Sequence, residues 1–255
     1  PLTPYMMLFD LIKGSRGERD IRFVFIDEIQ DYTPFQLAFL KFSFPKARFT
    51  MLGDLNQAIF TKENAVSLQD ELSQLFDPEK SEYIELTQTY RSTQQITDFS
   101  KDILTQGAQI DAFERKGALP TISVVPTTEA MVAGIIEQLA SNQAAEETTA
   151  IITKTLAEAE VAYAALRDQA DVTIIRTENQ RLVPGTIIVP AYLAKGLEFD
   201  AVIMWNAAAK VYHGDDERQL VYTIASRAMH QLTIFAVQEL TPLLANVADN
   251  LYEMR

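Results

Sequence analysis

The sequence predicts an α/β protein in which parallel strands are flanked by helices. Segments that read as strands alternate along the chain with segments of helical spacing about 10–15 residues long. The first strand segment, residues 21–27 (IRFVFID), is a continuous apolar run, which is typical of a strand buried on both faces of a parallel sheet.

The first third of the chain is expected to hold three strands and two helices. The strands are expected at 21–27, 48–54 and 82–86, and the helices at 33–44 and 64–76. Pro34 suits the first turn of its helix. The weakest boundary falls near residues 77–86, so we expect one domain at 1–84 and a second at 85–255.

The rest of the chain continues the alternation. Helices are expected at 91–106, 128–142, 156–169 and 216–229, and strands at 121–126, 148–154, 171–177, 185–194, 200–208 and 231–237. Ser92 is a plausible N-cap for the helix at 91–106.

Composition bounds the class of protein. The 255 residues are 47% hydrophobic and 22% charged, as in soluble globular proteins, and no apolar run approaches the roughly 18 residues of a membrane span. The chain has no cysteine, which excludes disulfides and fits a cytoplasmic location. Its net charge of −13 lowers the expectation of tight, independent DNA binding, because phosphate neutralisation supplies most of that affinity.

An acid pair ends the first strand. Asp27 and Glu28 would lie at the carboxyl edge of a sheet, where α/β folds bind ligands. Nucleotide hydrolysis needs one acid to hold Mg²⁺ and another to orient or deprotonate the attacking water. The alternative is that the pair is only a polar strand ending, since acidic residues end many strands.

Further polar positions follow, each with a structural alternative. Gln57, after the Gly-Asp turn of the second strand, could sense a γ-phosphate by hydrogen bond. Tyr90 could stack on a base, and Arg91 could bind a phosphate or only cap a helix.

Two later segments add candidates. Gly196 allows close backbone approach, and Glu198 could accept a hydrogen bond from a ribose hydroxyl. Arg227 could be an arginine finger, or a cation that complements the dipole of a helix C-terminus.

The order of these segments is more specific than any one of them. The acid pair, Gly-Asp-x-x-Gln, TYRST, AKGLEFD and Ser-Arg-Ala together resemble motifs II to VI of the UvrD/Rep-type superfamily 1 helicases, from about residue 22 to 237. The resemblance implies RecA-like parallel sheets of the P-loop NTPase type. It also implies that the first RecA-like domain is incomplete, with its C-terminal half at 1–84 and the second RecA-like domain at 85–255.

The resemblance implies ATP and Mg²⁺ as cofactors and a role for each residue. Asp27 resembles the Mg²⁺-associated acid, and Glu28 the catalytic base. Gln57 resembles the γ-phosphate sensor, and Tyr90 the residue that stacks on adenine. Arg91 and Arg227 resemble the arginines that reach the γ-phosphate from the second RecA-like domain. Glu198, beside Gly196, resembles the ribose contact.

The chain departs from the family pattern in three ways. It contains no G-x-x-x-x-G-K-[ST] phosphate loop, so we expect this loop in an upstream N-terminal part of the same protein and expect the chain alone to be inactive. Lys62 stands where a tryptophan would be, which leaves Phe60 as the aromatic there. Pro190 and Tyr192 replace a threonine and a histidine that help contact the strand. These departures count against tracking along a single strand. Phe60 and Tyr192 are the expected nucleic-acid contacts.

Only about 100 residues separate TYRST from AKGLEFD, too few for the large insertion of the UvrD/Rep type. The form PAYLAKGLEFDAV and the missing insertion together resemble the helicase IV-like HelD branch, which implies release or recycling of RNA polymerase by an ATP-driven translocase. The net charge of −13 implies an acidic surface, which fits a protein partner with basic channels. The alternative is a conventional 3'-5' DNA helicase of repair or replication. A third possibility, a degenerate ATPase used as a binding module, is opposed by the intact acid pair and arginines.

Overall fold

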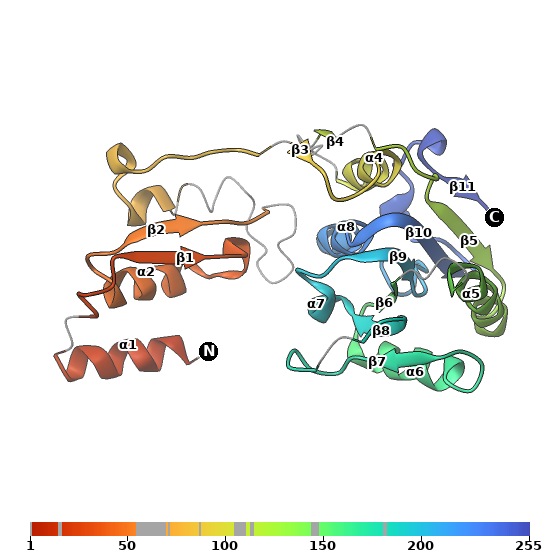
Figure 1. The fold of residues 1–255 in the computed structure, drawn as a ribbon, viewed down its shortest axis with the longest axis horizontal. Helices are drawn as coiled ribbons and strands as arrows, with labels where there is room; N and C mark the ends of the chain where they lie inside the picture. The colour runs from red at the N-terminus through yellow and green to blue at the C-terminus, as the bar shows by residue number, and fades with distance from the viewer. Residues whose placement is uncertain are drawn as a thin grey trace. The chain divides into compact units, whose positions relative to one another are not determined.

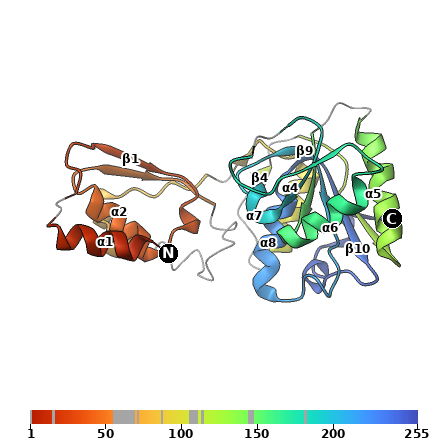
Figure 2. The same ribbon diagram turned by 90° about the horizontal axis from the view of Figure 1, so that it is seen from below.

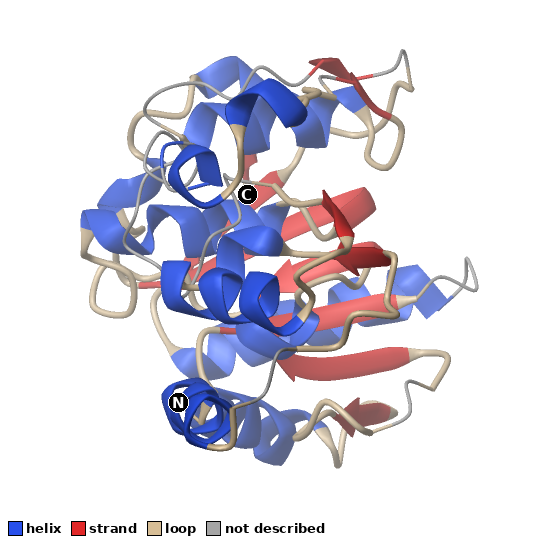
Figure 3. Cartoon of the chain, turned by 90° about the vertical axis from the view of Figure 1, so that its left-hand side faces the viewer, coloured by secondary structure: helices blue, strands red, loops and turns tan. Residues whose placement is uncertain are grey.

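The computed structural model describes residues 2–14, 17–54, 70, 72–86, 88–104, 111–112, 115–143, 148–180 and 183–255. The chain divides into two compact units, Pro1–Glu85 and Leu86–Arg255 (Figure 1). Helices alternate with strands along the chain (Figure 3), which confirms the predicted α/β class.

Unit 1 contains one small parallel sheet in its described part. Its elements are α1 (Thr3–Ile12), β1 (Phe23–Ile26), the 3-10 helix η1 (Ile29–Asp31), α2 (Pro34–Ser43), β2 (Arg48–Met51) and the 3-10 helix η3 (Pro78–Lys80). Strands β1 and β2 pair in parallel, from Phe23 opposite Arg48 to Ile26 opposite Met51.

Helix α2 contributes to the small core of this unit. Thr33 and Gln36 form a capping box at its start, and Pro34 occupies the first turn as predicted. Leu37 of α2 is buried in one hydrophobic cluster with Ile26 of β1 and Ile29 of η1. The apolar spacing of the helix therefore packs it against the face of β1 and β2 that carries Ile26.

Two expectations for unit 1 are wrong. Strand β1 is not buried on both faces, because Phe23 and Phe25 are 62% and 73% exposed on the face opposite the buried Ile26. Residues 82–86 form no strand; Tyr83 and Ile84 are exposed, and within the described part of the chain no strand pairs with them. An apolar run becomes a stable strand only where a partner supplies hydrogen bonds and cover. Most of the expected helix at 64–76 lies outside the described residues.

Unit 2 is a larger α/β layer structure (Figures 1 and 2). Its strands are β3 (Gln88–Thr89), β4 (Asp111–Ala112), β5 (Thr121–Val125), β6 (Thr149–Thr153), β7 (Val172–Ile174), β8 (Thr186–Pro190), β9 (Phe199–Met204), β10 (Ala228–Val237) and β11 (Glu253–Met254). Its helices are α4 (Gln94–Ile103), α5 (Thr128–Gln143), α6 (Leu156–Leu166), α7 (Ala191–Ala194) and α8 (Arg218–Ala225), with 3-10 turns η4 (Asp215–Glu217), η5 (Pro242–Leu244) and η6 (Asp249–Leu251).

Among the described residues, seven strands form one parallel sheet in the order β11-β5-β10-β9-β6-β8-β7. Helices α4, α7 and α8 contribute to one hydrophobic core, and α5 and α6 to a second. Adjacent residues of β9, Val202 and Ile203, belong to different cores, so the sheet is covered on both faces. This confirms a parallel sheet flanked by helices for unit 2.

Some boundaries in unit 2 differ from the prediction. The strand expected at 185–194 ends at Pro190, and Ala191–Ala194 form α7. The helix expected at 216–229 ends at Ala225, so Ala228 begins strand β10 instead. Ser92 does not cap α4: Thr93 is the N-cap residue, and the Ser92 hydroxyl donates to the carbonyl oxygen of Ala228. Within the described part of the chain, no helix is both long and apolar enough to cross a membrane.

Candidate functional site

The acid pair of unit 1 follows β1 directly. Asp27 is exposed, and its Oδ1 accepts a hydrogen bond from the backbone N–H of Glu28 at 2.8 Å. The backbone N–H of Leu52, just after β2, donates to the oxygen of Ile26, and that of Ile29 donates to the oxygen of Leu52. The parallel pairing therefore brings the acid pair beside the Gly-Asp turn that follows β2.

Glu28 has an unusual backbone. Its φ of 52° and ψ of 46° lie in the left-handed region, which costs a residue with a side chain about 1 kcal/mol or more. The conformation turns the chain from β1 into η1. Nε2 of the buried Gln30 donates to Oε2 of Glu28 at 2.5 Å. A strained, held carboxylate at the end of a strand is a feature found at functional sites.

Gly53 makes this packing possible. A Cβ atom at Gly53 would lie 2.3 Å from Oε1 of Gln30 and 2.8 Å from a methyl carbon of Ile29. The missing side chain lets Gln30 lie against the turn, where it holds Glu28. The sequence reasoning missed Gln30, although an amide within two residues of an acid pair is a usable signal.

Asp27 suits a magnesium ion whose other ligands are mainly phosphate oxygens and waters. Across the described residues, no three metal-binding side chains gather into a site. Mg²⁺ is commonly bound through one or two carboxylates together with phosphate oxygens and waters. A single exposed carboxylate at the carboxyl end of β1 is therefore a suitable protein ligand for it.

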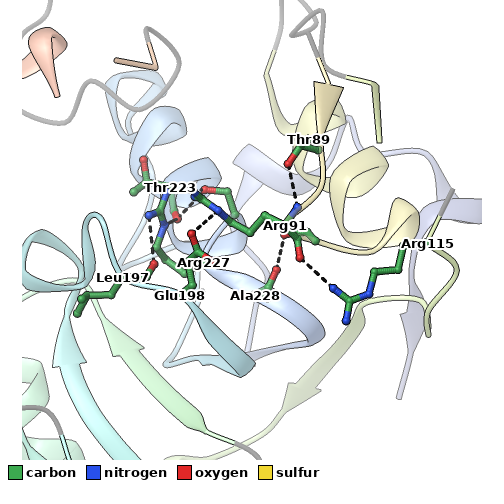
Figure 4. A network of polar contacts seen from close by, with 10 residues as sticks. Thr89, Arg91, Arg115, Leu197, Glu198, Thr223, Arg227 and Ala228 are labelled. Atoms are coloured by element: carbon green, nitrogen blue, oxygen red, sulfur yellow. Dashed lines mark hydrogen bonds and ion pairs between the residues drawn. The ribbon is translucent and has the colours of Figure 1, made fainter. Parts of the chain in front are cut away.

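Three separate segments meet in unit 2 because of one strand register. Phe199 of β9 lies opposite Ala228 of β10. Glu198 and Arg227 are the residues immediately before these two, so both lie at the amino ends of neighbouring strands. The TYRST segment joins them, since Ser92 Oγ donates to Ala228 O at 2.6 Å (Figure 4). In addition, Thr93 N donates to Met229 O at 3.1 Å.

Arg91 and Glu198 form an ion pair in this site. Nε of Arg91 lies 2.6 Å from Oε1 of Glu198, and the two side chains are 41% and 39% exposed (Figure 4). The nearby side chain of Arg115 donates to the carbonyl oxygen of Arg91 at 3.4 Å. Arg115 was not found from the sequence, because it lies outside every recognised motif.

Arg227 is 1% exposed and is held by the protein's own backbone. Its Nε donates to Thr223 O and its Nη1 to Leu197 O, both at 3.2 Å, and its Nη2 donates to Ser226 Oγ at 3.3 Å (Figure 4). The bond to Thr223, in the last turn of α8, matches the alternative in which the arginine satisfies a helix C-terminus. The bond to Leu197 also fixes the turn that precedes Glu198.

The remaining expected site residues have different surroundings. Gly196 has a φ of 76°, so the turn before β9 uses a conformation that glycine adopts without strain. Tyr90 is exposed, and its hydroxyl donates to Gln88 Oε1 at 2.8 Å. Tyr192 lies on α7 and is also exposed. Gln57 and Phe60 lie outside the described residues.

A second polar cluster follows β6. The ammonium group of Lys154 donates to Val211 O at 2.6 Å and forms an ion pair with Glu217. The backbone N–H of Lys154 donates to Oε2 of Glu158 at 3.0 Å. Burial raises the pKa of Glu158 above its ordinary value of 4.5. These contacts tie the end of β6 to the loop that leads into α8.

Comparison with known proteins supports the class indicated by this architecture. Dbp5 of Saccharomyces cerevisiae, in a structure bound to RNA and ADP BeF3, has a TM-score of 0.59 and 13% identity over 97% of this chain. Its L327V variant has a TM-score of 0.58 and 13% identity over 99% of this chain. This chain spans 63% and 64% of those chains. The likeness shows the fold alone, which is that of RecA-like helicases.

The family follows from sequence as well as structure. A crystal structure of the C-terminal domain of a possible DNA helicase from Lactobacillus plantarum WCFS1 is 54% identical, with a TM-score of 0.59, over 65% of this chain and 98% of that one. Residues 187–235 match the UvrD-like helicase C-terminal domain, and residues 14–69 the UvrD/REP helicase N-terminal domain. No curated protein matched the chain. The chain belongs to the UvrD-like helicase family.

Proposed function

We propose that this chain is the C-terminal part of an ATP-dependent superfamily 1 helicase or translocase. The supporting observation is the meeting of Arg91, Glu198 and Arg227, from three separate segments, at the amino ends of β9 and β10. A guanidinium group and a carboxylate so placed suit the phosphate and the ribose of a nucleotide. The polypeptide that hydrolyses ATP would also contain a phosphate loop, which this sequence does not include.

In unit 1, we assign Asp27 to magnesium and Glu28 to the attacking water. Bound Mg²⁺ supplies charge neutralisation at the phosphates. Glu28 is proposed as the general base, and Gln30 as the residue that keeps its carboxylate in place. Gln57 is proposed as the γ-phosphate sensor.

In unit 2, Tyr90 is proposed to stack on the adenine and Glu198, beside Gly196, to bind the ribose. Arg91 is the better candidate for direct contact with the γ-phosphate, because its side chain is exposed. Arg227 could reach a phosphate only by giving up the carbonyl oxygens that it now binds. Phe60 and Tyr192 are proposed contacts to nucleic acid.

The finer role that we propose is ATP-driven release of RNA polymerase from nucleic acid. The short distance from TYRST to AKGLEFD and the net charge of −13 support it. A conventional 3'-5' DNA helicase is the second candidate, and the 54% identical domain, described as part of a possible DNA helicase, favours a DNA substrate.

Phosphate release by the whole protein tests the ATPase proposal. Glu28→Gln should lower turnover by about 100-fold or more while ATP still binds, because a general base contributes about 10²–10⁴-fold. Glu82→Gln, an exposed acid in the same unit, is the control and should keep full activity. The 255-residue chain alone should release no phosphate. Unchanged turnover in Glu28→Gln would remove Glu28 from the reaction.

A pull-down separates the two finer roles. The whole protein, tagged, is incubated with RNA polymerase, and unwinding of a DNA duplex is measured in parallel. Retention of polymerase with poor unwinding supports the polymerase-linked role. Strong unwinding without retention rejects that role and supports the DNA helicase.

A further inference from the structure

Arg91 and Glu198 bind each other with the same groups that the proposed function assigns to a nucleotide. The ion pair joins Nε of Arg91 to Oε1 of Glu198 at 2.6 Å. We propose that the pair is a nucleotide-responsive latch, in which a bound nucleotide exchanges one ion pair for two contacts, Glu198 to the ribose and Arg91 to a phosphate. The inference rests on the proposed function, because that function supplies the two ligands.

The surroundings of the pair allow this exchange. Both side chains reach solvent. Their backbones, in contrast, are fixed by neighbours: the buried Ser92 donates to Ala228 O, and the buried Arg227 donates to Leu197 O (Figure 4). The side chains can therefore change partners while the segments that carry them stay in place.

The strength of the pair also suits a latch. Exposed ion pairs are weak, so Glu198 should oppose phosphate binding at Arg91 by only about two- to fivefold in the binding constant. Arginine binds phosphate oxygens through strong, charge-assisted hydrogen bonds. A multiply charged phosphate group can thus displace the Glu198 carboxylate.

Tripolyphosphate is the probe that separates the two contacts, because it has phosphates but no ribose. NMR of the arginine Nε–Hε signals follows the binding of tripolyphosphate, and separately of ATP, to the 255-residue chain. The Arg91 signal is the one that is missing from the spectrum of Arg91→Lys. Glu198→Gln should bind tripolyphosphate about two- to fivefold more tightly than the wild type. The affinity for ATP should increase by a smaller factor, because Glu198→Gln also weakens the contact with the ribose.

Glu160→Gln is a matched control. Glu160 forms an exposed ion pair with Arg176 at the same 2.6 Å in the same unit, and the substitution removes the same charge. It should leave tripolyphosphate binding unchanged. The double variant Arg91→Gln/Glu198→Gln should not show the tighter tripolyphosphate binding that is expected of Glu198→Gln alone.

The proposal is overturned if Glu198→Gln binds tripolyphosphate no more tightly than the wild type, if Glu160→Gln gains equally, or if the Arg91 signal responds in neither protein. These outcomes are independent of the test of function. A failed exchange leaves Glu28-dependent hydrolysis by the whole protein intact, whereas loss of that dependence rejects the ATPase proposal without altering the tripolyphosphate measurement.

Discussion

Arg227 donates through Nη1 to the carbonyl oxygen of Leu197 at 3.2 Å, so the residue before β10 holds the turn before β9. Its Nε donates to Thr223 O in α8 at the same distance. One buried guanidinium group therefore connects a helix end to a turn of the candidate site. This bonding gives Arg227 a structural role whatever its role toward phosphate.

Arg227→Met should destabilise unit 2 by about 2–4 kcal/mol, because Leu197 O and Thr223 O each lose the hydrogen bond that the buried Arg227 donates, and Thr223 O keeps only the one from Ser226 Oγ. Denaturant unfolding followed by the fluorescence of Trp205, which is buried in this unit, measures the effect. Arg176→Met removes an exposed arginine and should cost at most about 1 kcal/mol. Equal stability of the two variants would show that the Arg227 bonds contribute little.

Ser92→Ala should lower the stability of unit 2 by about 1–2 kcal/mol. The Ser92 hydroxyl is buried and donates to Ala228 O at 2.6 Å, so its loss leaves a buried acceptor with one donor fewer. Trp205 fluorescence again reports the unfolding. Ser81→Ala, which removes a hydroxyl bonded to Asp77 O in an exposed segment, should change stability by less than about 0.5 kcal/mol.

Gly53→Ala should loosen the acid pair of unit 1. The added methyl group would meet Gln30 at 2.3 Å and displace it from Glu28, which should cost about 1–3 kcal/mol. Hydrogen exchange over residues 23–52, followed by mass spectrometry, should become faster. Gln30→Ala makes room for the methyl group, so the double variant should cost less than the sum of the single ones. Strict additivity would contradict the packing that we describe.

Two glutamates of α6 should respond to pH in opposite directions. Burial raises the pKa of Glu158, so its carboxylate costs stability at neutral pH, and this cost disappears as the pH falls through the raised pKa towards 4.5. Glu158→Gln keeps an acceptor for Lys154 N. It should melt at a higher temperature than the wild type at pH 7, and the difference should close on acidification.

Glu160 should affect stability at neutral pH in the opposite direction to Glu158. Its hydrogen bond with Arg176 lowers the pKa of the carboxyl group below 4.5, so its stabilisation is present at pH 7 and is lost as the pH falls through the lowered pKa. Glu160→Gln should melt at a lower temperature than the wild type at pH 7, with the difference closing below about pH 4.5. Melting curves of both variants from pH 4 to 8 check the pair. If both variants shifted the melting temperature at pH 7 in the same direction, the opposite pKa shifts of Glu158 and Glu160 would be contradicted.

Much of the fold was predictable because strands and helices have different periods of apolar residues. The strand segments at 121–126 and 148–154 and the helix at 156–169 each contain the corresponding element. The segment at 82–86 shows the limit of such reasoning. Its composition suits a strand, but no described strand pairs with it and its side chains stay exposed. A strand needs a partner that its own residues cannot supply.

By itself, the sequence determined the alternating α/β pattern and the order of the motifs, because both are properties of residue spacing along the chain. Only the tertiary structure decided that Glu28 is left-handed and held by Gln30, that Arg227 is buried, and that Arg91 binds Glu198. These features depend on the register of neighbouring parallel strands. Because register joins residues that are distant in sequence, local patterns do not contain it.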